Sequence, residues 1–252
     1  MKKFISSIVL LMLTLNIFSQ DVETLSDSAQ SCFMQTRYAE ALNLYDSICS
    51  LGYSSSDLYY NMGNCYYRLN NIPYSIYYYE KSLLLDPSNN DAEFNLNIAN
   101  RSLKQVVEVL PKPFYERWWS SLVHIMSADA WTIFSIIMLV LVLVGIGMYL
   151  FFGNIALRKT GFSIAVISLL ALILSSICAY NATAAIKENN YAVVFEQTMV
   201  KSSPNADAVN SFEIYEGLTI QVVDSANGLY NIRLADGKEG WVDSNDVKMI
   251  AE

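Results

Sequence analysis

Two long stretches without an acidic or basic side chain, residues 131–152 and 161–180, constrain this chain more than any other feature. A helix needs about 20 apolar residues to cross about 30 Å of hydrocarbon, and each stretch meets that length. Only residues 153–160 separate them, which predicts a two-helix transmembrane hairpin with a short turn. A buried hairpin in the core of a soluble domain is the alternative, but helices of that kind normally keep a polar face.

The charges of the turn predict the orientation of the hairpin. Arg158 and Lys159 are the charged residues between the two stretches. Because short cytoplasmic loops are enriched in Lys and Arg, we expect the turn 153–160 to be cytoplasmic. Both flanking regions would then lie together on the outer side of the membrane.

The first residues favour the same orientation. Residues 1–19 are typical of a secretory signal peptide, with Lys2 and Lys3 before an apolar run and Ser19 as a small residue at the cleavage position. An uncleaved anchor is the other interpretation. Either one would export the segment that follows.

Residues 22–103 contain an internal repeat with a period of 34 residues, since Ala41 and Tyr45 recur as Ser75 and Tyr79. The copy at 56–89 is the clearer one. It carries the residues of a tetratricopeptide repeat (TPR), namely Tyr59, Met62, Gly63 and Tyr66 in a first helix, Ser75, Tyr79 and Ser82 in a second helix, and a closing Pro87. This resemblance implies antiparallel helix pairs: two repeats, and a partial third copy at 91–103 that caps the stack.

Repeats of this family bind peptides in a groove lined by their first helices, so the resemblance implies a set of groove residues. The candidates are Tyr60, Asn61, Asn64, Tyr67, Arg68 and Asn95. Asn61 and Asn95 share one repeat position, and side-chain amides both donate to and accept from a peptide backbone. Arg68 suits a carboxylate. The alternative is that the Asn side chains solvate a helix face and the Tyr side chains pack.

Residues 111–130 form an aromatic approach to the membrane. Pro111 and Pro113 break the preceding helix, and Trp118 and Trp119 follow. Aromatic side chains with one polar edge favour the headgroup region, which predicts an interfacial helix. A contact with a partner protein is the competing interpretation.

After residue 190 the pattern changes to short β-branched runs that alternate with turn residues. Asn227-Gly228 and Asp236-Gly237 predict hairpin turns, and five short strands predict a small barrel over 190–252. The segment resembles a bacterial SH3-like domain in Glu216-Gly217 and in Gly240-Trp241 of its closing hairpin, where Trp241 would cap the core. The candidate ligand surface is Tyr215, Tyr230 and Trp241; core and rim packing is the alternative.

Metal, redox and catalytic motifs are missing from the sequence. His124 is the single histidine and has no Cys or carboxylate at ligand spacing, so we expect neither a metal nor a cofactor. A Cys49–Cys65 disulfide and reduced buried thiols both remain open. There is no phosphate-binding glycine loop, no HExxH and no Ser–His–acid set, which predicts that the chain is not an enzyme.

The net charge of −8 and the lack of a Lys/Arg cluster argue against nucleic acid as a partner. We therefore expect protein partners.

The predicted fold class is a multidomain membrane protein with all-α TPR hairpins, a two-helix transmembrane hairpin and a small all-β SH3-like barrel. This order of modules resembles BatE-type proteins of bacterial aerotolerance operons. The resemblance implies a two-pass inner-membrane protein with periplasmic TPR and SH3-like domains, beside von Willebrand A-domain membrane proteins and a MoxR-type ATPase. A scaffold for envelope proteins is the leading hypothesis; peptidoglycan sensing or tethering and a chaperone-like role are the others.

Overall fold

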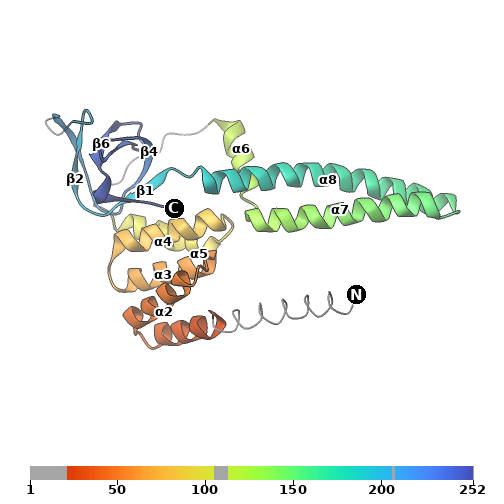
Figure 1. Ribbon diagram of the computed structural model, residues 1–252, viewed down its shortest axis with the longest axis horizontal. Helices are drawn as coiled ribbons and strands as arrows, with labels where there is room; N and C mark the ends of the chain where they lie inside the picture. Colours follow the sequence, from red (N-terminus) through yellow and green to blue (C-terminus); the bar gives the residue numbers. More distant parts are fainter. Residues whose placement is uncertain (1–21, 105–112, 206–207, 252) are drawn as a thin grey trace, which may run out of the picture.

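The computed structural model describes residues 22–104, 113–205 and 208–251 (Figure 1). The predicted signal peptide, 1–19, and the first two residues of the aromatic segment, 111–112, lie outside these ranges. Figure 1 shows a helical array and a β-sheet stacked at one end of the molecule, with two long helices projecting from that end.

The helical array is built from consecutive antiparallel helices. A helix at 22–34 is followed by α2 (Tyr38–Ser50), α3 (Ser56–Arg68), α4 (Ile72–Leu85) and α5 (Asn90–Arg101). Polar N-caps start three of them, because Ser55, Asn71 and Asn89 each accept a hydrogen bond from a backbone N–H three residues later. The helix pairs therefore begin where the 34-residue period places them.

Small residues bring α3 and α4 together. A Cβ atom on Gly63 would lie 2.6 Å from the ring of Tyr79, so only glycine lets this buried ring cross the helix. Ser82 is buried opposite Ser56, and the two hydroxyls are 2.9 Å apart. Small side chains therefore allow the close contact between α3 and α4.

The two projecting helices are α7 (Ala128–Phe151) and α8 (Ile155–Lys187), preceded by the short α6 (Phe114–Val123). The turn between them is shorter than the predicted range 153–160, because α8 already begins at Ile155. Asn154 caps this helix, and its side chain accepts a hydrogen bond from the Ala156 N–H at 2.8 Å. With 33 residues α8 is about 50 Å long at 1.5 Å per residue, so it exceeds the hydrocarbon thickness.

The helices α7 and α8 are long and apolar enough to cross a membrane, which fits a membrane anchor. Their apolar side chains lie mostly on the outside, as at Leu143, Leu150 and Ile167, and this favours the membrane over a soluble core. They touch at Gly145 and Gly161, where an added Cβ would come within 2.7 Å of the opposite backbone. Such close backbone approach is typical of helix pairs in membranes.

The C-terminal region is a seven-stranded antiparallel sheet in the order β3-β2-β6-β5-β4-β1-β7. Its strands are β1 (Tyr191–Val194), β2 (Thr198–Lys201), β3 (Asn210–Ile214), β4 (Thr219–Ala226), β5 (Leu229–Arg233), β6 (Glu239–Asp243) and β7 (Val247–Met249). The prediction of a five-stranded barrel was wrong in strand number and in closure. The edge strands β3 and β7 do not pair with each other, so the sheet stays open.

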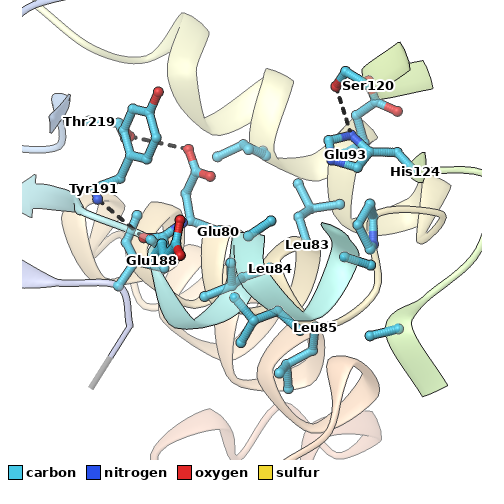
Figure 2. A pocket seen from close by; sticks show the side chains of 18 of the residues that line it. Glu80, Leu83, Leu84, Leu85, Glu93, Ser120, His124, Glu188, Tyr191 and Thr219 are labelled. Carbon is cyan, nitrogen blue, oxygen red and sulfur yellow. Dashed lines mark hydrogen bonds between the residues drawn. The ribbon is translucent and has the colours of Figure 1, made fainter. Parts of the chain in front are cut away.

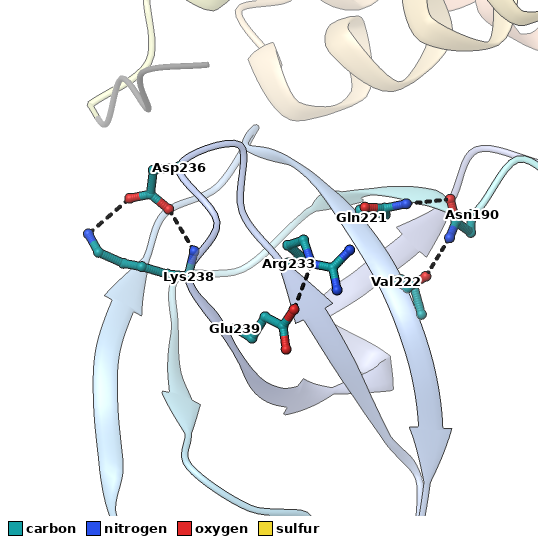
Figure 3. A network of polar contacts seen from close by, with 7 residues as sticks. All are labelled: Asn190, Gln221, Val222, Arg233, Asp236, Lys238 and Glu239. Atoms are coloured by element: carbon teal, nitrogen blue, oxygen red, sulfur yellow. Dashed lines mark hydrogen bonds and ion pairs between the residues drawn. The ribbon is translucent and has the colours of Figure 1, made fainter. Parts of the chain in front are cut away.

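The two predicted hairpin turns are confirmed. Asn227 and Gly228 both have positive φ, 54° and 76°, as a tight turn between β4 and β5 requires. Between β5 and β6, Asp236 accepts from the Lys238 backbone N–H at 3.0 Å and pairs with its ammonium group at 3.0 Å (Figure 3). Arg233 and Glu239, paired at 2.6 Å, join the same two strands across the hairpin (Figure 3).

The sheet packs directly on the helical array through β1. Ala192 and Val194 enter the core of the sheet, whereas Val193, between them, joins the cluster that contains Ile76 and Leu96 of the array. Both faces of β1 are therefore buried. This explains why the segment from Tyr191 reads as a continuous apolar run rather than an alternating one.

Candidate functional site

Alternate helices of the array enclose a cavity of about 370 Å³, which we call the groove cavity. It is lined from the helix at 22–34 by Phe33, from α3 by Tyr60, Asn64, Tyr67 and Arg68, from α4 by Tyr79, and from α5 by Asn95 and Ile98. Five of the six predicted groove residues are in this set. The cavity thus lies on the face formed by the first helix of each repeat.

Asn61 is the predicted groove residue that does not line the cavity. On α3 the lining positions 60, 64, 67 and 68 follow the spacing of one helix face. Asn61 is one residue, or about 100°, away from Tyr60, so its side chain starts from a different part of the helix surface. The shared repeat position of Asn61 and Asn95 therefore does not bring them into one site.

A short hydrogen-bond network crosses the groove cavity. Asn64 Oδ1 accepts from the Tyr79 hydroxyl at 2.7 Å and from Asn95 Nδ2 at 2.8 Å. Asn95 Nδ2 also lies 3.5 Å from the Tyr60 hydroxyl oxygen. Among the described residues, Asn64 Nδ2 and Asn95 Oδ1 have no hydrogen-bond partner, which leaves the NH₂ group of Asn64 as a donor group and the carbonyl oxygen of Asn95 as an acceptor group for a ligand.

The electrostatics of the cavity favour an anionic group at its rim. Burial raises the pKa of Tyr79 well above its ordinary value, so its hydroxyl stays a neutral donor. Arg68 is the one Lys or Arg among the lining residues, and its side chain is exposed at the end of α3. Within the described parts of the chain Arg68 forms no salt bridge, so its guanidinium group is available to a carboxylate.

Sequence reasoning missed Phe33, Tyr79 and Ile98 as lining residues. The repeat period contained the signal for two of them: Phe33 stands 34 residues before Tyr67, and Ile98 stands 34 residues after Asn64. The sequence places Tyr79 among the signature residues of the second helix. In the structure its ring packs against Gly63, and its hydroxyl also reaches the cavity.

The three aromatic candidates of the C-terminal region do not share one surface. Tyr230 of β5 pairs with Val242 of β6 and packs against the core of the sheet. Trp241 is the neighbour of Val242, so it lies on the opposite face and does not cap the core. The Tyr215 hydroxyl donates to Glu213 at 2.9 Å.

The described cysteines are not linked to one another. Cys32, Cys49, Cys65 and Cys178, all in described positions, form no disulfide. Burial raises the pKa of Cys65 to about 12, which disfavours the thiolate that a nucleophile needs. Within 22–104, 113–205 and 208–251, no three His, Cys, Asp or Glu side chains gather closely enough to hold a metal ion.

Comparison with known proteins supports the repeat. Residues 56–89, which include α3 and α4, match the tetratricopeptide repeat family. No curated protein matches the chain. A tetratricopeptide repeat indicates a role in protein–protein interaction, and the groove cavity lies on the repeat that matches.

Proposed function

We propose that this protein is a membrane-anchored adaptor that binds an extended segment of a partner protein in the groove of its helical array. The observation that carries the proposal is the groove cavity, which spans three alternate helices. Its lining contains the side-chain amides of Asn64 and Asn95 and a single exposed cation, Arg68. An extended peptide has one donor and one acceptor per residue, which matches the free groups of Asn64 and Asn95. The proposed role is assembly, without catalysis.

The anchor would hold the array and the sheet on one side of the membrane. The array precedes the helix pair α7 and α8 in the sequence, and the sheet follows it. Because the array and the sheet pack on each other, they would lie on the same side of the membrane. Arg158 and Lys159, next to the hairpin turn, favour a cytoplasmic turn and hence a periplasmic array and sheet.

The resemblance to BatE-type proteins supports a more specific setting. In that setting the partners are von Willebrand A-domain membrane proteins and a MoxR-type ATPase system of the bacterial inner membrane. The two tight hairpins of the sheet support its likeness to SH3-like domains, as an open sheet rather than a barrel. The aerotolerance connection rests on this resemblance.

The test is a mild-detergent affinity purification of the full-length protein, with co-purifying proteins identified and quantified. An Asn64→Ala/Asn95→Ala double variant is expected to lower recovery of the partner at least about tenfold, because each lost hydrogen bond is worth about 1 kcal/mol. Asn61→Ala is the matched control and should retain the partner. Equal recovery with the double variant and the control would overturn the groove as the binding site.

A further inference from the structure

A second and larger cavity, of about 950 Å³, lies where the helical array, α6, the end of α8 and the sheet meet (Figure 2). We call it the junction cavity. It shares no lining residue with the groove cavity. Its walls come from the C-terminal half of α4, from α5, from α6 and the turn after it, from the last turns of α8 and from β1.

The floor of the junction cavity is apolar and continues the membrane-exposed surface of α8. Ala182, Ala185 and Ile186 line it from α8, and they come directly before the first charged residues after the apolar stretch, Lys187 and Glu188. From the helical array, α4 contributes Leu83, Leu84 and Leu85 to the lining (Figure 2). The cavity therefore lies at the level where α8 leaves the hydrocarbon.

Three separate elements contribute acidic side chains to the polar part of the lining. Glu80 of α4, Glu93 of α5 and Glu188 after α8 all line the cavity (Figure 2), and no Lys or Arg is among the lining residues. Thr219 donates to Glu80 Oε1 at 3.2 Å. Burial nevertheless raises the pKa of Glu80, so a positive charge in the cavity would stabilise its ionised form.

Hydrogen bonds hold the walls of the junction cavity in place. The Trp131 indole N–H donates to the Val123 carbonyl at 2.9 Å and fixes the end of α6 against α7. Asn189 Oδ1 accepts from the Tyr191 N–H at 3.1 Å, where α8 leads into β1. The cavity is thus a built feature of the junction, lined by both apolar and acidic groups.

We propose that the junction cavity binds the juxtamembrane segment of a second membrane protein in which Lys or Arg directly follows apolar residues. The apolar part of that segment would cover the apolar lining from α4 and α8, and its cations would pair with the acidic side chains of the lining, Glu80, Glu93 and Glu188. A phospholipid headgroup fits less well, because its phosphate would face three carboxylates without a Lys or Arg to neutralise it. The site is independent of the groove cavity.

The test uses the full-length protein in nanodiscs of phosphatidylcholine, with empty nanodiscs as the reference. The probe is a fluorescent peptide of leucine and alanine ending in two lysines, compared by anisotropy with the same peptide ending in two glutamines. The lysine peptide is expected to bind at least about tenfold more tightly, and added salt should reduce the difference. Equal affinity of the two peptides overturns the proposal.

Variants then locate the binding. Glu93→Gln and Glu188→Gln should each weaken the lysine peptide about two- to fivefold, as expected for partly exposed ion pairs. Asp91→Asn is the matched control on α5, since Asp91 does not line the cavity. An Asn95→Ala variant should leave peptide binding unchanged, which separates this site from the groove. Phosphatidylethanolamine that co-purifies with the wild type but not with Glu93→Gln/Glu188→Gln would instead assign the cavity to a lipid.

Discussion

Lys248 of β7 donates a hydrogen bond to the Tyr74 hydroxyl of α4 at 3.0 Å, and joins two residues that lie 174 positions apart in the sequence. The same ammonium group lies 4.6 Å from the centre of the Tyr74 ring and 5.0 Å from that of Phe195. Tyr74 and Phe195 in turn meet edge to face at 4.6 Å. The helical array and the sheet are therefore joined by the aromatic pair Tyr74 and Phe195, with the ammonium group of Lys248 packed against both rings.

Replacing Lys248 should loosen this contact. In Lys248→Met the apolar stem is kept and the charge is lost, and an exposed cation–π contact is worth about 0.5–1 kcal/mol. Amide hydrogen exchange in β1 and β7 should become about two- to fivefold faster through easier local opening. Lys238→Met is the control, since Lys238 pairs with Asp236 inside its own turn. Equal exchange in the two variants would contradict the role of Lys248.

Gly145→Ala should weaken the pairing of α7 and α8. Its new Cβ would lie 2.7 Å from Gly161 O and 2.7 Å from Ala165 N, which are backbone atoms, so the helices must separate. We expect a loss of about 1–3 kcal/mol, measured by SDS-induced unfolding in mixed micelles. Gly147→Ala is the matched control on the same helix, because nothing lies within 4 Å of its Cβ. Identical unfolding of both variants would show that close packing at Gly145 is unimportant.

Tyr79→Phe should weaken the groove without unfolding the array. The ring that crosses Gly63 is kept, but the hydroxyl that donates to Asn64 Oδ1 at 2.7 Å is lost. The Asn64 amide is then held by one fewer hydrogen bond, and such a bond contributes about 1 kcal/mol of free energy. Partner recovery in the purification described above should fall, while the far-ultraviolet circular dichroism stays unchanged. Tyr45→Phe, at a buried tyrosine outside the groove cavity, should retain the partner.

The sequence predicted the helical array from its 34-residue repeat, and the paired apolar helices from two long runs without charged residues. The groove face was predicted in large part from the same repeat, and Asn61 was misplaced because a one-residue step rotates a helix position by about 100°. The predicted number of strands, five, was two too low. The strand β7 has only three residues and β3 begins with polar residues, so both give a weak sequence pattern. The contact between Lys248 and Tyr74 could not be predicted, since no periodicity connects residues in different folding units.

The array should lose stability in alkaline solution through its buried thiol and phenols. Burial raises the pKa of Cys65 from 9.0 to about 12, and the pKa of Tyr45 and Tyr66 from 10.0 to about 12. Between pH 9 and 12 the unfolded chain therefore releases protons that the folded chain keeps. Because the folded state then binds more protons, the free energy of unfolding falls as pH rises, by about 1.4 kcal/mol per pH unit for each group.

Tyr66→Phe tests this mechanism at one group. The Tyr66 ring stacks between Tyr74 at 4.9 Å and Tyr78 at 5.3 Å, and phenylalanine can keep both contacts. Without its hydroxyl, the variant should show a shallower loss of stability between pH 10 and 12, measured by urea unfolding at a series of pH values. Tyr115→Phe, at an exposed tyrosine of α6, should follow the wild-type curve. A Tyr66→Phe curve parallel to that of the wild type would mean that Tyr66 titrates alike in the folded and unfolded chain.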